Sequence, residues 1–590
     1  MRLRRIGLIA LVACVCFGCE KKDDSNRIPS DVPENQATPS YSNIAVTTDK
    51  AAYGPGDEVT FTIDNASLPV ATKVRYKYLN NVISEASVTG SIWKWKTPAT
   101  DYRGYIAEVF ATTNNAETIY ATIAVDVSSD WKKFPRYGFL SKFPQLSDAD
   151  INSVISNLNR YHINGLQFYD WQNKHHKPLP VASSGPAASW KDIINRDIYF
   201  STVQRYIAAA HSRNMKAMFY NLIYGAWDNA EADGVQKEWY VFTDNTHTNR
   251  DFHPLSSPFL SNIYLLDPSN PSWQQYLETE NRKVYQFLDF DGFHMDQLGD
   301  RGARYKYDGT YLNLSSTFKT FIDGVKADEP QKDIVMNAVA QYGQKSIAES
   351  STDFLYTEVW SPFDSYTDLS NLIQQNNIYS NNTKNSVLAA YMNYDLANTK
   401  GYFNTPSVLL TDAVIFAFGG AHLELGEHML GKEYFPNDKL SMKDDLKSAM
   451  VNYYDFLVAY QNLLRNGSSI NTVSLTSSDN KMMLGAWPPS QGMVATFGKK
   501  VENTQVIQLI NFTNSTTQNW RDNMGIQAEP VLIKDSKLVL TSDAAVKKIW
   551  MASPDIIGGA SRSLNFTQTG DKVSFVLPEL KYWSMIVVEY

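Results

Sequence analysis

The stretch PSWQQYLETENRKVYQFLDFDGFHMDQ, residues 271–297, contains the structural unit that decides the fold. Pro271 can open a helix because its fixed φ suits the first helical turn, and Trp273 and Tyr276 follow at helical spacing. The stretch ends in a short apolar run, Gly292–Gln297, which indicates a buried strand. A helix that leads directly into a buried strand is typical of proteins in which strands and helices alternate along the chain.

The same alternation extends over residues 131–471, where eight apolar strand candidates are separated by helical stretches of about 10 to 20 residues. The strand candidates are Arg136–Leu140, Gly165–Asp170, Lys216–Asn221, Gly292–Gln297, Ile334–Val339, Phe354–Trp360, Val387–Asn393 and Ala421–Gly426. Eight such repeats predict a closed (β/α)8 barrel, also called a TIM barrel. A doubly wound open sheet is the alternative, but no glycine-rich phosphate-binding turn follows the first strand candidate.

Short β-like runs, separated by Gly, Pro, Asn and Asp, flank this central region on both sides. In residues 43–130 they include Val59–Ile63 and Thr118–Ile123, and their spacing predicts an immunoglobulin-like β-sandwich. In residues 472–590 they include Val506–Phe512 and predict a second β-sandwich. We therefore expect a multidomain chain with a central barrel.

The N-terminus has the pattern of an export signal. Three arginines precede the apolar run Ile6–Phe17, whose length of about 12 residues is too short to cross a bilayer. Gly18 and Cys19 resemble the lipid-attachment motif of bacterial lipoproteins, although Cys16 stands where an aliphatic residue is usual. We expect residues 1–18 to be a lipoprotein signal peptide and Cys19 to carry the lipid.

Residues 19–42 are polar and carry three prolines, a composition that predicts a flexible tether. The charged run EKKDD, residues 20–24, resembles the surface-export signals of Bacteroidetes lipoproteins, with a plain solvated tether as the alternative. The expected location is the outer membrane, with the protein exposed at the cell surface or, as the alternative, facing the periplasm. Contact with the membrane would be made only through the lipid on Cys19.

Charge and cysteine content narrow the choice of partners. The chain has 54 Lys and Arg against 62 Asp and Glu. Removing residues 1–18 takes away three Arg and no acid, which leaves 51 basic and 62 acidic residues and a net charge of −11. Such an acidic protein is poorly suited to nucleic acid. All three cysteines lie within the first 19 residues, so the mature chain can form neither a disulfide nor a cysteine-ligated metal site.

Two of the strand candidates carry carboxylates near their carboxyl ends, and these should face one cavity. The site of a (β/α)8 barrel lies at the carboxyl ends of its strands. Because side chains alternate along a strand, His294 and Asp296 should face inward while Phe293 and Met295 face the helices. The same parity turns Glu358 inward, so Asp296 and Glu358 are the candidate catalytic residues.

Two converging carboxyl groups are the minimum for cleaving a glycosidic bond, since one must protonate the leaving oxygen and the other must stabilise or trap the oxocarbenium-like carbon. A carboxyl group crowded by Tyr356, Trp360 and another acid should have a raised pKa, which suits the proton donor. The residues alone do not say which acid has which role. A loop salt bridge or a helix cap is the alternative role for each.

The sequence around these acids resembles glycoside hydrolase family 66, the dextranases and cycloisomaltooligosaccharide glucanotransferases, over nearly everything after the tether. The order and spacing of the matching stretches, rather than any one of them, carry the resemblance. These stretches are Asp49–Asp57, Pro135–Ser141, Tyr169–Trp171, His175–Pro178, Tyr220–Tyr224, His294–Asp296, Tyr356–Trp360 and Glu433–Asn437.

The resemblance implies that Asp296 is the nucleophile and Glu358 the acid/base of a retaining double displacement. It further implies an endo-acting hydrolase that cleaves the α-1,6 linkages of dextran to isomaltooligosaccharides, without a cofactor. Retaining enzymes hold their two carboxyl groups about 5 to 5.5 Å apart, whereas inverting enzymes separate them by roughly 6.5 to 9.5 Å.

Within this family the transferases carry a large carbohydrate-binding insertion near the seventh unit of the barrel. Here only 27 residues separate Asn393 from Ala421, and most of them have a helical pattern. The sequence therefore predicts hydrolysis, and formation of cyclic isomaltooligosaccharides, or other transfer, is the alternative.

Polar and aromatic residues at the strand ends are the candidate sugar contacts. They are Asp170, Trp171, His176, Tyr220, Asn221, Tyr224, His294, Gln297, Trp360, Asn393, His422 and Glu424. Loop packing is the alternative for each, above all for the neighbouring His175. A metal site formed by His422, Glu424, Glu427 and His428 is conceivable, but the resemblance favours hydrogen bonds to sugar, and no metal is predicted.

Two rival functions share many of these features. A non-catalytic surface glycan-binding lipoprotein would have the same anchor, sandwiches and aromatic content, although binding alone needs neither Asp296 nor Glu358. A (β/α)8 glycosidase that acts on other linkages is the second rival, because a fold does not determine a substrate.

Overall fold

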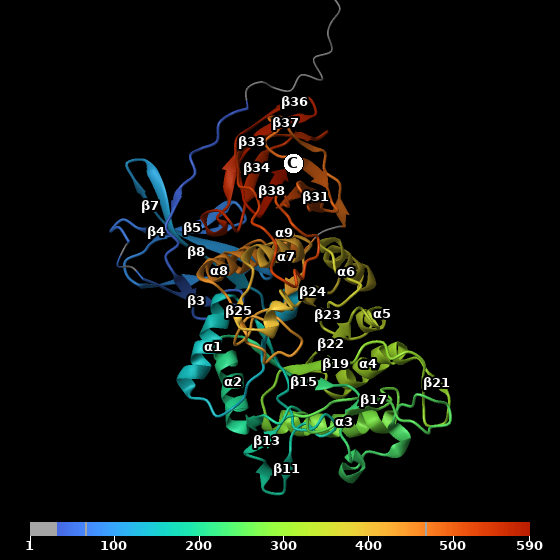
Figure 1. Cartoon of the computed structure of the whole chain (residues 1–590). Helices are drawn as coiled ribbons and strands as arrows, with labels where there is room; N and C mark the ends of the chain where they lie inside the picture. The colour runs from blue at the N-terminus through green and yellow to red at the C-terminus, as the bar shows by residue number, and fades with distance from the viewer. Residues whose placement is uncertain (1–31, 65, 67, 467–468) are drawn as a thin grey trace, which may run out of the picture.

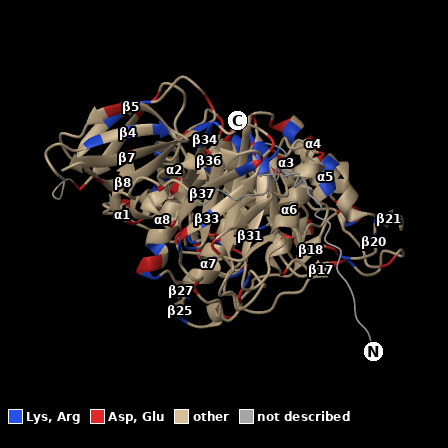
Figure 2. Ribbon diagram, turned by 90° about the horizontal axis from the view of Figure 1, so that it is seen from above, with Lys and Arg blue, Asp and Glu red and all other residues tan. Residues whose placement is uncertain are grey.

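The computed structural model describes residues 32–64, 66, 68–466 and 469–590 of the chain (Figure 1). The predicted signal peptide 1–18, the lipidation site Cys19 and the first part of the predicted tether lie outside these residues. Among the described residues, no helix is both long enough and apolar enough to cross a bilayer. Lys and Arg are interspersed with Asp and Glu over the ribbon as seen from above (Figure 2).

Eight parallel strands form the centre of the molecule, in the order β26-β24-β23-β22-β19-β15-β10-β9. Their bounds are β9 (Tyr137–Leu140), β10 (Gly165–Phe168), β15 (Lys216–Leu222), β19 (Gly292–Asp296), β22 (Asp333–Val339), β23 (Leu355–Glu358), β24 (Ser386–Ala389) and β26 (Ala421–His422). The Phe139 amide donates to the Leu425 carbonyl at 3.1 Å and joins the first strand to the segment that follows the last. All eight predicted strands and the predicted barrel are confirmed.

A helix follows every strand of the barrel. The helices are α1 (Asp148–Arg160), α2 (Phe200–Ser212), α3 (Pro271–Phe287), α4 (Phe318–Asp328), α5 (Gln344–Ala348), α6 (Tyr366–Tyr379), α7 (Thr405–Ala417) and α8 (Asp444–Ala459), after which comes the short α9 (Gln461–Leu464). Pro271 opens α3 as predicted, and the Asn270 side chain caps it by accepting from the amides of Ser272 and Trp273.

Alternation of side chains separates the two layers of the barrel. Phe293 and Met295 of β19 belong to the large core between strands and helices. Tyr137, Val335 and Tyr356 belong to a separate cluster inside the barrel. The parity that was predicted for β19 and β23 is therefore confirmed, and it places His294, Asp296 and Glu358 on the inner side.

Further short strands lie in the loops at the mouth of the barrel. After β10 come β11 (Val181–Ala182), β12 (Gly185–Pro186), β13 (Ser189–Lys191) and β14 (Asp197–Tyr199). After β15 come β16 (Gly225–Ala226), β17 (Phe252–His253) and β18 (Ile263–Leu265), and after β19 come β20 (Arg304–Tyr305) and β21 (Tyr311–Leu312). β25 (Gly401–Tyr402), which follows β24, pairs with β27 (Leu440–Ser441), which follows β26. These loops build the walls of the cleft described below.

Two sheets precede the barrel and share one apolar core. The five-stranded sheet, in the order β1-β8-β7-β4-β5, has β1 (Ser40–Tyr41), β4 (Lys73–Tyr78), β5 (Asn81–Ser87), β7 (Arg103–Thr113) and β8 (Ala116–Val127), and the three-stranded sheet has β2 (Val46–Thr48), β3 (Glu58–Ile63) and β6 (Ile92–Lys96). The Ala124 amide of β8 donates to Asp455 of α8 at 2.8 Å and links the larger sheet to the barrel.

Two further sheets follow the barrel and pack along its α7 and α8 side (Figure 1). One contains β28 (Ile470–Asn471), β30 (Leu484–Ala486), β31 (Val494–Val501), β32 (Thr504–Asn511), β34 (Lys548–Ala552), β35 (Arg562–Leu564) and β38 (Trp583–Glu589), and the other contains β29 (Leu475–Ser477), β33 (Ile533–Thr541), β36 (Phe566–Thr569) and β37 (Lys572–Leu580). Two expectations stay predictions. One is the immunoglobulin-like character of the first region, and the other is the division of the chain into domains at residues 43, 131 and 472.

Close backbone contact at the barrel seam gives a test of its closure. A Cβ atom on Gly426 would lie 2.5 Å from the Phe139 carbonyl oxygen. We expect Gly426→Ala to lower the free energy of unfolding by about 1 to 3 kcal/mol, because the seam must open to admit the methyl group. The measurement is urea denaturation followed by tryptophan fluorescence. Gly90→Ala is the control, since its Cβ would meet nothing within 4 Å; equal stability of the two variants would contradict tight closure at this seam.

Candidate active site

A cleft of about 500 Å³ opens at the carboxyl ends of the barrel strands. Its lining includes the inward residues Asp296 of β19, Asn337 of β22 and Glu358 of β23, which come from three neighbouring strands. A cleft at this end of the barrel is where the fold brings polar strand ends together. Both predicted catalytic carboxylates therefore share one cavity.

Asn337 holds the two carboxylates together. Its Nδ2 donates to Oδ1 of Asp296 at 2.8 Å and to Oε2 of Glu358 at 3.0 Å. Its Oδ1 accepts from the Glu358 amide at 3.2 Å, which fixes the orientation of the side-chain amide. The two carboxylate oxygens are at most 5.8 Å apart, because distances of 2.8 and 3.0 Å run from the same nitrogen.

One tyrosine hydroxyl supports each carboxylate from the other side. Tyr220 donates to Oδ2 of Asp296 at 2.7 Å, and Tyr391 donates to Oε1 of Glu358 at 2.6 Å. Every side-chain donor that reaches these two carboxyl groups from the described residues is thus neutral. Neutral donors orient a carboxyl group but offset only part of the cost of burying its charge.

This arrangement favours a proton on Glu358. Burial and then the charge of Asp296 raise the pKa of Glu358 to about 7, against the hydrogen bonds from Tyr391 and Asn337. Burial also raises the pKa of Asp296, while the hydrogen bonds from Tyr220 and Asn337 lower it. Two acids that share a site titrate as a pair, so near neutral pH the pair can hold one proton and one negative charge. A proton donor next to an ionised nucleophile is the combination that glycosidic cleavage requires.

Five of the predicted sugar contacts line the cleft: Asp170, Tyr220, His294, Gln297 and Trp360. His294 stacks between Tyr137 and Tyr220, with ring centroids 5.7 and 6.0 Å away, and burial lowers its pKa to about 3, so its ring is neutral. Asp170, at a positive φ of 48°, has a pKa raised to about 7 by burial, although Arg196 lowers it. A further carboxyl group that can be neutral thus faces the cleft.

Four other predicted contacts lie behind the cleft wall, because each is held by backbone or loop partners. The indole of Trp171 donates to the Tyr220 carbonyl, Asn221 donates to the His175 carbonyl, His176 lies 3.1 Å from Asp233, and Tyr224 accepts from the Leu298 amide. All four side chains are buried and none lines the cleft. The structure therefore corrects the expectation of direct sugar contact for them, whereas His175, for which packing was the alternative, lies in the cleft lining.

Asn393 is also displaced from the cleft, and it has a structural partner instead. The Asn393 amide donates to the Arg521 carbonyl at 2.8 Å and its side chain donates to the Asp522 carbonyl at 2.8 Å. β24 ends at Ala389, so the alternation of the strand no longer governs the direction of residue 393. The same loop aims the Arg521 guanidinium at the Val359 carbonyl, at 2.8 Å, and under the Trp360 ring, at 5.0 Å.

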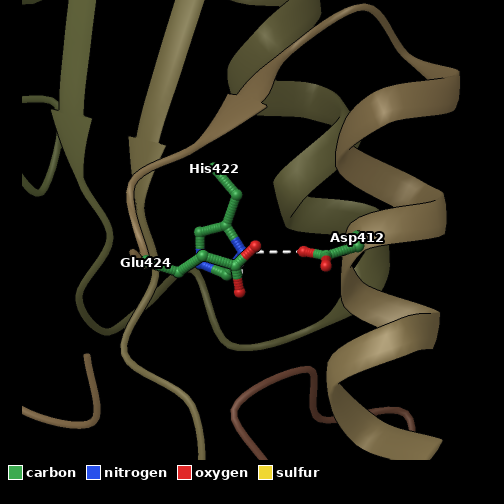
Figure 3. Close-up of side chains that lie close together, drawn as sticks. All are labelled: Asp412, His422 and Glu424. Carbon is green, nitrogen blue, oxygen red and sulfur yellow. Dashed lines mark hydrogen bonds and ion pairs between the residues drawn. The ribbon is translucent and has the colours of Figure 1, made fainter. Parts of the chain in front are cut away.

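His422 and Glu424 point away from the cleft into a buried cluster with Asp412 of α7 (Figure 3). Nδ1 of His422 lies 2.8 Å from Asp412 and 3.3 Å from Glu424, and its Nε2 lies 2.8 Å from the Ala390 carbonyl. Across the part of the chain that the structure describes, this is the one group of three side chains close enough to share a metal ion. Burial raises the pKa of both acids well above the usual range, which favours their neutral forms inside the protein. The predicted sugar contacts of His422 and Glu424 are corrected accordingly.

Asn337 and Tyr391, which donate to the two acids, are the cleft residues that the sequence analysis did not single out. Asn337 is the one polar residue in the strand candidate Ile334–Val339, and it shares the inward parity of Val335. A single polar residue with inward parity in an apolar strand was a sufficient signal to find Asn337. Tyr391 lies two residues beyond the end of β24, where strand parity gives no direction.

The model of glycosyl hydrolase family 66 matches residues 48–587 of the chain. A cycloisomaltooligosaccharide glucanotransferase from Niallia circulans is 29% identical over an alignment of 755 positions, which covers 100% of this chain and 75% of that protein. A dextranase from Streptococcus salivarius is 24% identical, over 89% of this chain and 71% of its own length.

A solved structure is similar over most of the chain. It is a Paenibacillus sp. cycloisomaltooligosaccharide glucanotransferase complexed with cycloisomaltoheptaose, with a TM-score of 0.84 and 26% sequence identity. The similarity covers 93% of this chain and 100% of the other.

The shared donor gives the first test of the site. For the dextran cleavage proposed below, we expect Asn337→Ala to lower kcat/KM by about 10²- to 10³-fold, because loss of a preorganised donor leaves both carboxyl groups unaligned. Reducing-sugar release measures the rate. Asn157→Ala, on the exposed face of α1, is the matched control; a loss of less than about threefold in Asn337→Ala would contradict the bridging role.

The hydrogen bond from Tyr391 gives the second test. Tyr391→Phe removes a donor that favours ionised Glu358, so the pKa of Glu358 should rise above about 7. In the acid/base role that the family resemblance implies for Glu358, its protonated form starts the reaction. The alkaline limb of the profile of kcat/KM against pH should therefore move to higher pH. A hydrogen bond of about 1 to 1.5 kcal/mol corresponds to a shift of roughly one unit. Tyr311→Phe, at an exposed position on β21, is the control; an alkaline limb that stays in place or moves to lower pH would refute the role of Tyr391.

Proposed function

The chain belongs to glycosyl hydrolase family 66, and on that basis we propose that it is a retaining endo-dextranase that cleaves α-1,6-glucosidic bonds. Asp296 is the nucleophile and Glu358 the acid/base in this proposal. The substrate class rests on the relatives, since one is named a dextranase and another was solved with cycloisomaltoheptaose. The product class is linear isomaltooligosaccharides.

The observation that carries the proposal is the shared donation from Asn337 Nδ2 to Asp296 and Glu358. It sets an upper limit of 5.8 Å on the separation of the two oxygens, from distances of 2.8 and 3.0 Å. This limit agrees with the spacing of about 5 to 5.5 Å in retaining enzymes. Inverting enzymes separate their carboxyl groups by roughly 6.5 to 9.5 Å, so the short distance between these two oxygens supports retention.

In the first step, an Asp296 oxygen attacks the anomeric carbon while Glu358 gives its proton to the departing glycosidic oxygen. The bond to the leaving chain breaks, and a glucosyl ester forms on Asp296. Tyr220 and Asn337 keep the attacking carboxylate aligned until it reacts. Glu358 is left ionised and accepts from Tyr391 and Asn337.

In the second step, Glu358 removes a proton from water, whose oxygen attacks the same anomeric carbon and displaces Asp296. Two inversions leave the product with the α configuration of the substrate. The cycle restores ionised Asp296 and protonated Glu358, so the two acids need no further proton source.

The short connection between β24 and β26 supports hydrolysis rather than cyclisation. Residues 390–420 contain only a short turn, β25 and α7. The Niallia circulans transferase aligns over 755 positions against the 590 residues of this chain, so that relative carries segments that this chain lacks. Glucanotransfer is the second candidate function, because two of the relatives named above are transferases. The surface-exposed lipoprotein location is part of the proposal and rests on the N-terminal sequence alone.

The test is reducing-sugar release from dextran by the native protein, Asp296→Ala and Glu358→Ala, with and without azide. Both variants should lose activity by orders of magnitude, and azide should restore turnover. Azide that replaces the Asp296 carboxylate should give a β-glycosyl azide, whereas azide that attacks the ester in Glu358→Ala should give the α anomer. Asp444→Asn, at an exposed position on α8, is the control.

Three results would count against the proposal in different ways. Cyclic sugars as the main product would assign the chain to glucanotransfer. Binding of dextran without cleavage would make it a glycan-binding protein. Cleavage of starch or cellulose in preference to dextran would retain the two acids and change the linkage.

A further inference from the structure

A second cavity, of about 90 Å³, lies at the junction between the barrel and the sheets that follow it. Its lining includes Lys133, just before β9, and Asn385, just before β24. It therefore opens at the amino ends of the strands, whereas the cleft with Asp296 lies at their carboxyl ends. Lys499 of β31 completes one wall, so the cavity joins the floor of the barrel to the neighbouring sheet.

The charges around this cavity have one sign. Lys133, Lys384, Arg465 and Lys499 line it, with no carboxylate among the lining residues that the structure describes. In the part of the chain that the structure describes, the hydrogen-bond partners of Lys384, Arg465 and Lys499 are backbone carbonyls rather than carboxylates. Such a cluster of cations without a counter-charge is unfavourable to bury.

The guanidinium of Arg465 has an open edge inside the protein. Arg465 is only 7% exposed, and its Nη1 donates to the Pro135 carbonyl at 3.0 Å. Its Nε and Nη2 have no hydrogen-bond partner in the described part of the chain. These two nitrogens form the edge of a guanidinium that can donate two parallel hydrogen bonds to two oxygens of one anion.

The surrounding charges do not satisfy this edge. Asp126, which acts on Arg465 over a distance, is already paired with Arg136 at 2.7 Å. Burial and the charge of Arg136 lower the pKa of Arg465 to about 9, and burial and the charge of Arg465 lower the pKa of Lys499 to about 8. Nζ of Lys499 has the Leu464 carbonyl at 2.9 Å as a partner, which is neutral. A negative charge in the cavity would relieve the repulsion between Arg465 and Lys499.

We propose that this cavity is a binding site for one small oxoanion, such as inorganic phosphate or sulfate, held by Nε and Nη2 of Arg465. Lys133 and Lys499 surround the anion and neutralise its charge. A sugar or nucleotide is too large, since pockets for ligands of that size measure about 300 Å³ or more. The bound anion connects the barrel to β31 and stabilises their junction.

The experiment is isothermal titration of the whole protein with inorganic phosphate, in a buffer that contains no other oxoanion. The native protein should bind one phosphate per chain, and Arg465→Gln should weaken the affinity by about tenfold or more because both fork donors are lost. Lys133→Gln, at an exposed position, serves as a second variant that does not disturb the buried side chains, and should weaken it about threefold. Lys534→Gln, an exposed lysine on β33, is the control and should bind as the native protein does.

The two parallel donors of Arg465 predict that the site prefers oxoanions to chloride. Sulfate should compete with phosphate. Chloride at equal ionic strength should compete at least about tenfold less well, because a monatomic ion cannot accept both parallel hydrogen bonds. Phosphate should also raise the Tm of the native protein and leave that of Arg465→Gln unchanged. No saturable binding at about 50 mM phosphate, or equal affinity in the native protein and Arg465→Gln, would overturn the proposal.

Discussion

The burial of two carboxyl groups in one cleft, supported by neutral donors alone among the described side chains, is the constraint on which the active site depends. Asp296 and Glu358 lie on β19 and β23, and the strand between them, β22, supplies Asn337, whose single nitrogen reaches both. Because no cationic side chain of the described residues donates to the pair, it is driven to share one proton rather than to ionise twice. The same burial therefore favours one protonated and one ionised acid near neutral pH, which is the combination that the proposed double displacement needs.

The rest of the fold keeps these three side chains in register. Neighbouring parallel strands place their ends at one level, and the seam between Phe139 and Leu425 holds the barrel closed with backbone in direct contact. The sheets after the barrel also reach the site, because their loop sets Arg521 against the Val359 carbonyl and under the Trp360 ring. Changes in that loop should thus affect the acid/base without touching substrate.

The sequence was sufficient for the barrel and for the inward direction of Asp296 and Glu358, since period-two alternation in apolar runs determines which side chains face inward. Asn337 could have been found by the same rule. Asn393 could not be placed, because β24 ends four residues earlier and the chain turns at a φ of 52°. For Trp171 and Glu424 the limit was different, because their side chains bond to distant segments, at the Tyr220 carbonyl and the Tyr454 hydroxyl. No local pattern reveals whether such a side chain faces sugar or a buried neighbour.

The central claim is that Asp296 forms a covalent bond to the sugar while Glu358 transfers the proton. The most direct measurement is mass spectrometry of the protein after reaction with a fluorinated isomaltosyl fluoride, which slows hydrolysis of the ester, followed by peptide mapping. The account predicts a single added glycosyl group on the peptide that contains Asp296, and its absence from Asp296→Asn. An adduct on Glu358, or no adduct together with products of inverted configuration, would contradict it.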